Sequence, residues 1–381
     1  MVPLALAQAA DDALDRLRRV APASHHLPES GAALLGERAH LMQLSRNHRA
    51  SPTGHCRLID CADGRIALNL AREDDWDLLH ALLGQPAESW DAISKASRNL
   101  LAGELVERGA AMGMAIARDE ICPLVPWLNQ TSSQEGSADQ AKPPLVVDLS
   151  SLWAGPLTGS LLADLGAEVI KVESTHRPDG AREGNQEFFD LLNAKKRSIG
   201  VDFRTPEGRK ALRQLIERAD IVVEASRPRA LRQLGIDAEA ILASKPGKIW
   251  LRILAHGDDE DRIGFGDDIG VAAGLPSIME RAWGEPFMVG DAIADPLTGL
   301  HGALAVWECR ERGGGAVLQV SMRDVVRSSM GAFEGIDLPA RAQEWDEVAR
   351  EFGTTDCPFR AAYGKAETIG QSNHLLAELA C

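Results

Sequence analysis

The back two thirds of the chain alternate short apolar runs with amphipathic stretches. Buried parallel strands are typically short runs rich in Val, Ile and Leu that are bounded by turns. The pattern predicts strands at 145–149, 168–173, 197–202, 221–224 and 248–253, with helices between them. Strands that alternate with helices indicate a doubly wound parallel sheet. We therefore predict an α/β fold whose large, Rossmann-like domain spans residues 143–381.

The front third has a different pattern. Helical periodicity at 9–19 and 31–44 precedes a predicted β-hairpin, whose two alternating segments meet at an Asp-Gly turn at 63–64. Two more helices are expected at 74–83 and within 90–111. We interpret residues 1–126 as a small α+β domain. Residues 127–142 are polar and lack periodicity, so we predict an interdomain linker there.

A turn at Gly290 leads into a strongly helical stretch with Leu297, Leu300 and Leu304 at helical spacing. Asp295 suits the N-cap position and Pro296 the first helical position. The positive end of the helix dipole would then hold the Asp295 carboxylate ionised. Judged by spacing alone, Asp295 is more simply a helix cap than a nucleophile.

The loops after the predicted strands are where a doubly wound sheet binds its ligands. The loop at 153–159 contains glycines but no G-x-G-x-x-G motif, so a nicotinamide or flavin enzyme is disfavoured. Basic residues gather in and beside these loops, which favours an anionic ligand. They are Lys171, Arg177, Arg182, Lys195, Lys196, Arg197, Arg227 and Arg229.

Composition narrows the function further. The net charge of −15 and the 4% of aromatic residues argue against a nucleic-acid or anionic-membrane partner. The six cysteines form no CxxC pair, which is typical of free thiols in a reducing compartment. No apolar run approaches the length of a membrane span. We therefore expect a cytoplasmic protein without a metal site.

Ordered blocks of the chain resemble the class III CoA-transferases, which include formyl-CoA transferase, carnitine CoA-transferase and alpha-methylacyl-CoA racemase. The residues that carry the resemblance are Val147–Pro156, Leu162–Glu173, Lys196–Ile199, Thr205–Arg209, Ala219–Glu224, Gly315–Asp324 and Leu375–Leu379. They follow one another in the family's order over most of 145–381.

The resemblance implies a CoA-transferase whose catalytic carboxylate is Asp295, with Asp291 as a weaker candidate. In the family, the aspartate attacks an acyl-CoA to form a mixed anhydride and then an aspartyl-CoA thioester, from which an acceptor acid takes CoA. For coenzyme A itself, we expect Lys171, Arg177 and Arg227 near the phosphates. Trp153, Ala154 and His256 complete the expected CoA site, and the family implies a homodimer.

The chain also departs from the family pattern. Phe265 stands where the racemase branch has a histidine, although His256 or Asp267 could replace that base. Ala225 and Ser226 stand where an Asn-Phe pair usually precedes the Arg-Pro. The small domain comes first, which indicates a permuted order. An acyl-CoA racemase and a CoA-binding protein without turnover therefore stay open as alternatives.

Overall fold

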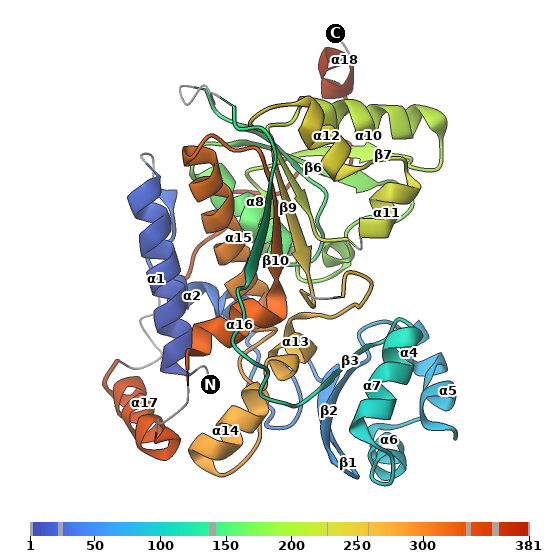
Figure 1. Cartoon of the computed structure of the whole chain (residues 1–381), viewed down its shortest axis with the longest axis vertical. Coiled ribbons are helices and arrows are strands. Elements are labelled where there is room, and N and C mark those ends of the chain that lie inside the picture. The colour runs from blue at the N-terminus through green and yellow to red at the C-terminus, as the bar shows by residue number, and fades with distance from the viewer. Residues whose placement is uncertain are drawn as a thin grey trace.

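A seven-stranded sheet forms the centre of the molecule (Figure 1). The computed structural model describes residues 3–21, 26–136, 142–226, 228–257, 259–332, 337–352 and 358–379. The strand order is β4-β10-β9-β8-β5-β6-β7. The bounds are β4 Leu128–Ser132, β5 Leu145–Asp148, β6 Glu168–Ser174, β7 Arg197–Val201, β8 Ile221–Glu224, β9 Ile249–Leu254 and β10 Ala316–Ser321.

Six of these strands are parallel, and only β4 runs antiparallel, beside β10. The chain winds outward from β5 through β6 to β7, then returns to β8 and continues through β9 to β10. This is the doubly wound, Rossmann-like order, and the predicted fold class is confirmed. Its direction changes between β5 and β8, and doubly wound sheets generally bind ligands in a crevice beyond the carboxyl ends of the strands at such a point.

Helices cover both faces of the sheet. The helices from β5 onward are α8 Ala154–Asp164, α9 Gln186–Asn193, α10 Pro206–Arg218, α11 Pro228–Gln233, α12 Ala238–Ser244, α13 Gly266–Ala272, α14 Leu275–Trp283, α15 Ala294–Glu311, α16 Met322–Met330, α17 Leu338–Phe352 and α18 Leu375–Leu379, with a 3-10 turn at Gly180–Glu183. Thr205 caps α10, because its side chain accepts a hydrogen bond from the Gly208 N–H.

A separate three-stranded antiparallel sheet lies beside α13 (Figure 1). It comprises β1 Cys56–Cys61, β2 Gly64–Asn69 and β3 Ala115–Arg118, with helices α4 Asp74–Asp77, α5 Leu79–Leu83, α6 Trp90–Ser97 and α7 Ala102–Ala111. The predicted hairpin is confirmed, since Cys61 pairs with Gly64 across the turn. One face of this sheet packs on its own helices, and the other packs Leu58 and Ala67 against Val271 of α13.

The structure divides the chain differently from the predicted domain ranges. The first helices, α1 Leu4–Val20, α2 Gly31–Leu34 and α3 Glu37–Leu41, belong to the core of the large sheet and not to the small unit. Figure 1 shows α1 alongside α15 and α16. The predicted linker contains β4, which pairs with β10. Polar β4 was missed because it is an exposed edge strand with no buried face to give it periodicity.

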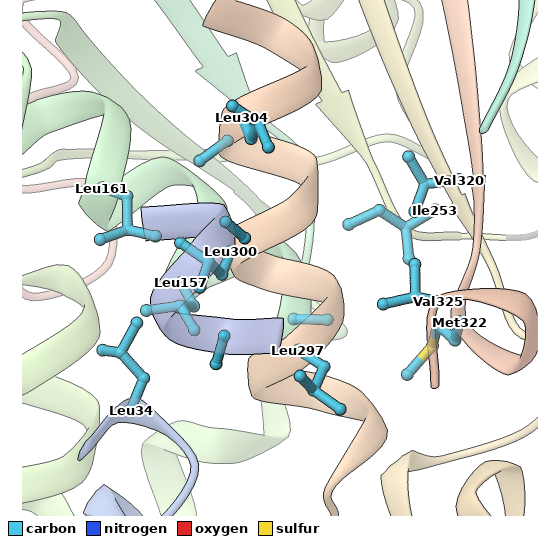
Figure 2. Packing of buried hydrophobic residues seen from close by; sticks show 14 of the residues in the cluster. Leu34, Leu157, Leu161, Ile253, Leu297, Leu300, Leu304, Val320, Met322 and Val325 are labelled. Carbon is cyan, nitrogen blue, oxygen red and sulfur yellow. The ribbon is translucent and has the colours of Figure 1, made fainter. Parts of the chain in front are cut away.

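Helix α15 runs through the middle of the large core. Residues 296–300 and 302–307 are all buried, so the helix is covered on every side and the predicted stripe is too narrow. Figure 2 shows Leu297, Leu300 and Leu304 on this helix, with α8 on one side and residues of β9, β10 and α16 on the other. Contacts along the whole length of α15 therefore fix the position of its first turn, which contains Asp295.

None of the helices in the described part of the chain combines the length and apolar character that crossing a bilayer requires. Among the described cysteines, Cys56, Cys61, Cys122 and Cys309 are free thiols. Cys357 and Cys381 lie outside the described residues.

Candidate active site

Asp295 lies in the first turn of α15, not before it. The helix begins at Ala294 with Ile293 as its N-cap, so the prediction that Asp295 is the N-cap is wrong. The preceding turn continues directly into the helix through Ala292, whose φ of 44° is unusual for a residue with a side chain. The Asp295 side chain is half-buried and thus neither sealed in the core nor fully in solvent.

Two other helices begin at the Asp295 carboxylate. The N–H of Ala154, the first residue of α8, lies 3.3 Å from Oδ1 of Asp295. The N–H of Gly266, the first residue of α13, also donates to this carboxylate. Helix N-termini carry partial positive charge and N–H groups without intrahelical partners. The start of α15 and these two further helix starts therefore surround one acidic side chain, which suits an anionic reacting group.

Small residues bring α8 close enough to α15 for this contact. A Cβ on Gly299 would lie 2.8 Å from the carbonyl oxygen of Ala154, so only glycine permits the observed approach. The Thr158 hydroxyl bridges the helices, because it contacts the carbonyl oxygens of Ala154 at 3.2 Å and of Gly299 at 2.9 Å. Packing between two helices thus determines where the Ala154 N–H meets Asp295.

Arg38 is a site residue that sequence reasoning missed. This α3 side chain forms two hydrogen bonds with Asp291, from Nε to Oδ2 at 2.8 Å and from Nη2 to Oδ1 at 2.5 Å. The carboxylates of Asp267 and Asp295 also interact electrostatically with its guanidinium. No spacing links position 38 to positions 267–295, so no sequence pattern could have indicated this contact. Because Asp291 is 2% exposed and held by Arg38, it is the poorer nucleophile candidate.

The prediction that Asp295 is held ionised is also wrong. Burial raises the pKa of Asp295 to about 7, with Asp267 raising it further, while Arg38 and the N–H groups of Ala154 and Gly266 act in the opposite direction. Burial and the charge of Asp291 likewise raise the pKa of Asp267 to about 6. The helix termini therefore offset only part of the desolvation, and Asp295 changes its charge near neutral pH.

Replacing Asp267 with Asn is expected to shift activity that depends on ionised Asp295 toward lower pH. The charge of Asp267 raises the pKa of Asp295, and Asn removes that charge while keeping an oxygen for the Ala292 N–H, which is 2.9 Å away. A fall in the pKa of Asp295 from about 7 to about 6 would raise its ionised fraction at pH 6 roughly fivefold. The rate measured from pH 5 to 9 checks this, and an unmoved profile would show that Asp267 does not influence Asp295.

Lys171 has a different place from the one predicted. Its side chain is 1% exposed, and Nζ lies 2.8 Å from Oδ2 of Asp179 and 2.9 Å from the carbonyl oxygen of Ser150. Oδ1 of Asp179 accepts the N–H of Leu152, which has a φ of 70°. Such backbone strain persists where surrounding contacts determine it. Lys171 thus supports the loop that leads to Ala154, and we no longer place it at a phosphate.

The other predicted cofactor residues are distributed around this loop. Trp153 is buried, with its ring 4.7 Å from the guanidinium of Arg38 and packed edge-on against Phe188. Arg177 is exposed after β6, so its charge is accessible to a ligand. His256 is buried after β9. Arg227 lies outside the described residues. The structure therefore brings Ala154 and Trp153 to the Asp295 site and leaves Arg177 as an accessible cation in the loop after β6.

Two hollows of about 470 and 300 Å³ lie elsewhere, at the amino end of β7. They contain neither Asp295 nor any residue predicted to bind CoA, although Lys195, Lys196 and Arg197 of the basic group line the first hollow. Their cations already have partners, because Lys195 pairs with Asp164, Arg197 with Glu367 and Arg360 with Glu37. We therefore do not place the reaction there. Within the described residues, no group of three or more His, Cys, Asp or Glu side chains is arranged to hold a metal ion.

Comparison with known families finds a match to the part of the chain that contains Asp295. A family described as CoA-transferase family III matches residues 144–359, which include the loop before α8 and the whole of α15. The match begins just before β5 and omits the small sheet. The succinyl-CoA–D-citramalate CoA-transferase of Chloroflexus aurantiacus is 34% identical over 199 residues, which cover 49% of this chain and 50% of that protein.

Other similar proteins match over comparable lengths. The succinate–glutarate CoA-transferase of Agrobacterium fabrum is 33% identical over 185 residues, covering 43% of this chain and 46% of that enzyme. A solved CAIB/BAIF family protein from Brucella suis is 30% identical, with a TM-score of 0.45 over 52% of this chain and 56% of that one. The chain thus spans about half the length of the curated relatives it matches.

Proposed function

Because the chain belongs to CoA-transferase family III, we propose that it moves CoA from an acyl-CoA thioester to a carboxylic acid, with Asp295 as the nucleophile. The observation that carries this proposal is the half-buried carboxylate of Asp295, toward which the N–H groups of Ala154 and Gly266 point. The similar proteins named above, which transfer CoA, support the reaction class.

The proposed reaction has four exchanges at carbonyl carbons. An oxygen of the Asp295 carboxylate attacks the thioester, and CoA leaves as the thiolate with the C–S electron pair, giving a mixed anhydride. The thiolate attacks the Asp295 carbonyl and releases the donor acid, which leaves an aspartyl-CoA thioester. The acceptor carboxylate then attacks this thioester and expels CoA. Finally, the thiolate attacks the acceptor acyl group and restores the Asp295 carboxylate.

The site has features that this reaction needs. Each tetrahedral intermediate places negative charge on an oxygen beside Asp295, and backbone N–H groups at helix starts stabilise such charge without reorganising. A pKa of about 7 makes Asp295 a stronger base than an ordinary carboxylate, while a useful fraction stays ionised at neutral pH. We propose that CoA lies in the crevice between the loops after β5 and β8, with its phosphates near Arg177 and Arg227.

An acyl-CoA racemase is the second candidate. Asp267, whose pKa is about 6, belongs to the same group of interacting charges as Asp295 and supplies a second titratable carboxyl group. Racemisation would exchange the α-proton of a 2-methylacyl-CoA with deuterated water and would need no acceptor acid. A homodimer and a cytoplasmic location stay predictions.

Incubation with succinyl-CoA tests the transferase proposal. We expect a covalent CoA adduct on the peptide that contains Asp295, detectable by mass spectrometry and released by hydroxylamine. Addition of a second acid, such as glutarate, should discharge the adduct and yield its CoA thioester. If no acyl-CoA labels the protein while α-proton exchange proceeds, the racemase is the correct assignment. CoA binding without either reaction would indicate a binding protein.

A further inference from the structure

Among the residues that the structure describes, the guanidinium of Arg38 forms hydrogen bonds along one edge only. Nε and Nη2 donate to Asp291, whereas Nη1 has no hydrogen bond to any described residue. Nη1 is not one of the fully buried polar atoms that lack a partner, so it is exposed to solvent. The Arg38 side chain as a whole is 21% exposed. An arginine presents five N–H donors in a fixed plane. Arg38 therefore has donors that remain accessible to a ligand.

The acceptor acid meets an electrostatic obstacle at this site. Asp267, Asp291 and Asp295 form a local excess of negative charge, and an incoming carboxylate adds to it. The charge of Arg38 acts on all three carboxylates, and its action on Asp295 opposes that of Asp267. Once Asp295 has become a neutral thioester, one carboxylate fewer competes for Arg38. The positive charge is then available when the acceptor must bind.

We propose that Arg38 binds the carboxylate of the acceptor acid through Nη1 while its other edge holds Asp291. This inference rests on the proposed transferase function. One oxygen of the acceptor accepts hydrogen bonds from the guanidinium, and the other forms the new C–O bond at the Asp295 carbonyl as the C–S bond breaks. CoA leaves as the thiolate with the electron pair, and Arg38 keeps its protons. The ring of Trp153, 4.7 Å from the guanidinium, restricts the plane in which the acceptor can lie.

The test isolates the step in which the acceptor reacts. The aspartyl-CoA adduct is formed with succinyl-CoA, separated from free substrate, and then mixed with either glutarate or hydroxylamine at pH 8.5. Hydroxylamine is uncharged at this pH and attacks the same carbonyl without needing a cation. In Arg38→Ala, we expect the ratio of the glutarate rate to the hydroxylamine rate to fall about 10–100-fold, the effect of losing a charge-assisted contact.

Two further variants separate anion binding from support of the turn. Arg38→Lys keeps the charge but cannot hold Asp291 and the acceptor at once, so a smaller fall in the ratio is expected. Asp291→Asn removes a carboxylate that competes for Arg38 while leaving Arg38 in place, so the glutarate-to-hydroxylamine ratio should not fall, even if a disturbed turn lowers both rates.

The pH of the assay matters because Arg38 lowers the pKa of Asp295. Loss of Arg38 raises that pKa and slows adduct formation near neutral pH, whereas the discharge step starts from a thioester that has no such titration. The groups that face Asp295 are Arg38 of α3, Asp267 and the Gly266 N–H of α13, and the Ala154 N–H of α8. An unchanged glutarate-to-hydroxylamine ratio in both Arg38 variants would overturn the inference. An adduct that never forms in the unaltered protein would instead overturn the proposed function, and the inference with it.

Discussion

Replacement of Asp295 by Asn is expected to prevent covalent attachment of CoA and to lower CoA transfer more than about 10⁴-fold, as loss of a nucleophile does in other enzymes. Asn keeps the shape of the side chain and an oxygen for the Ala154 N–H, but it is not a nucleophile at a thioester. The measurement is steady-state transfer from succinyl-CoA to glutarate, together with the mass of the protein after incubation with succinyl-CoA.

The stability of this variant distinguishes lost chemistry from lost folding. The pKa of Asp295 is raised from its ordinary value of 3.8 to about 7, so ionising it opposes folding as pH rises through this range. Asn removes that penalty, which at about 1.4 kcal/mol per pKa unit is at most about 4 kcal/mol above pH 7. We expect Asp295→Asn to unfold at an equal or higher temperature at pH 8 and to show no such gain at pH 4. Retained transfer in a folded variant would exclude Asp295 as the nucleophile.

Replacement of Gly266 by Ala is expected to lower CoA transfer about 100-fold or more. The new Cβ would lie 2.2 Å from Oδ2 of Asp295 and 2.4 Å from the carbonyl oxygen of Ala292. The second contact is with backbone, so rotation of a side chain cannot relieve it. Either α13 or the turn before α15 must shift, and misplacement of a reacting group by about 1 Å can reduce a rate 100-fold.

Gly103→Ala provides the matched control for this variant. Gly103 lies near the start of α7, and the nearest atom to its new Cβ would be 3.8 Å away, at the end of the Arg118 side chain. We expect normal transfer and equal or slightly higher stability, since Ala favours a helix over Gly by about 1 kcal/mol. Equal rates in the two glycine variants would contradict the tight approach of α13 to Asp295. Overpacking should also lower the unfolding free energy of Gly266→Ala by about 1–3 kcal/mol.

Sequence patterns predicted the helices and strands well where a run of apolar residues and the turn residues beside it indicate the same element. The run at 221–224 is a central strand buried on both faces, and the Asp63-Gly64 turn joins two paired strands. Thr205 and Pro206 begin α10 as their residue types require. Prediction failed for elements that are stabilised by contacts with distant parts of the chain. β4 depends on pairing with β10, and α1 depends on a core that begins more than a hundred residues later along the chain.

The sequence by itself determined the doubly wound fold, the family resemblance and the choice of Asp295, because strand periodicity, turn residues and ordered motifs are local properties of the chain. Only the tertiary structure decided the charge environment of that carboxylate. Arg38, Asp267 and the first residues of α8 and α13 meet Asp295 through packing across distant segments. A pKa depends on burial and on charges nearby in space. Neither is encoded by spacing along the chain, so a helix beginning close to Asp295 could be predicted, whereas its exact first residue and the ionisation of Asp295 could not.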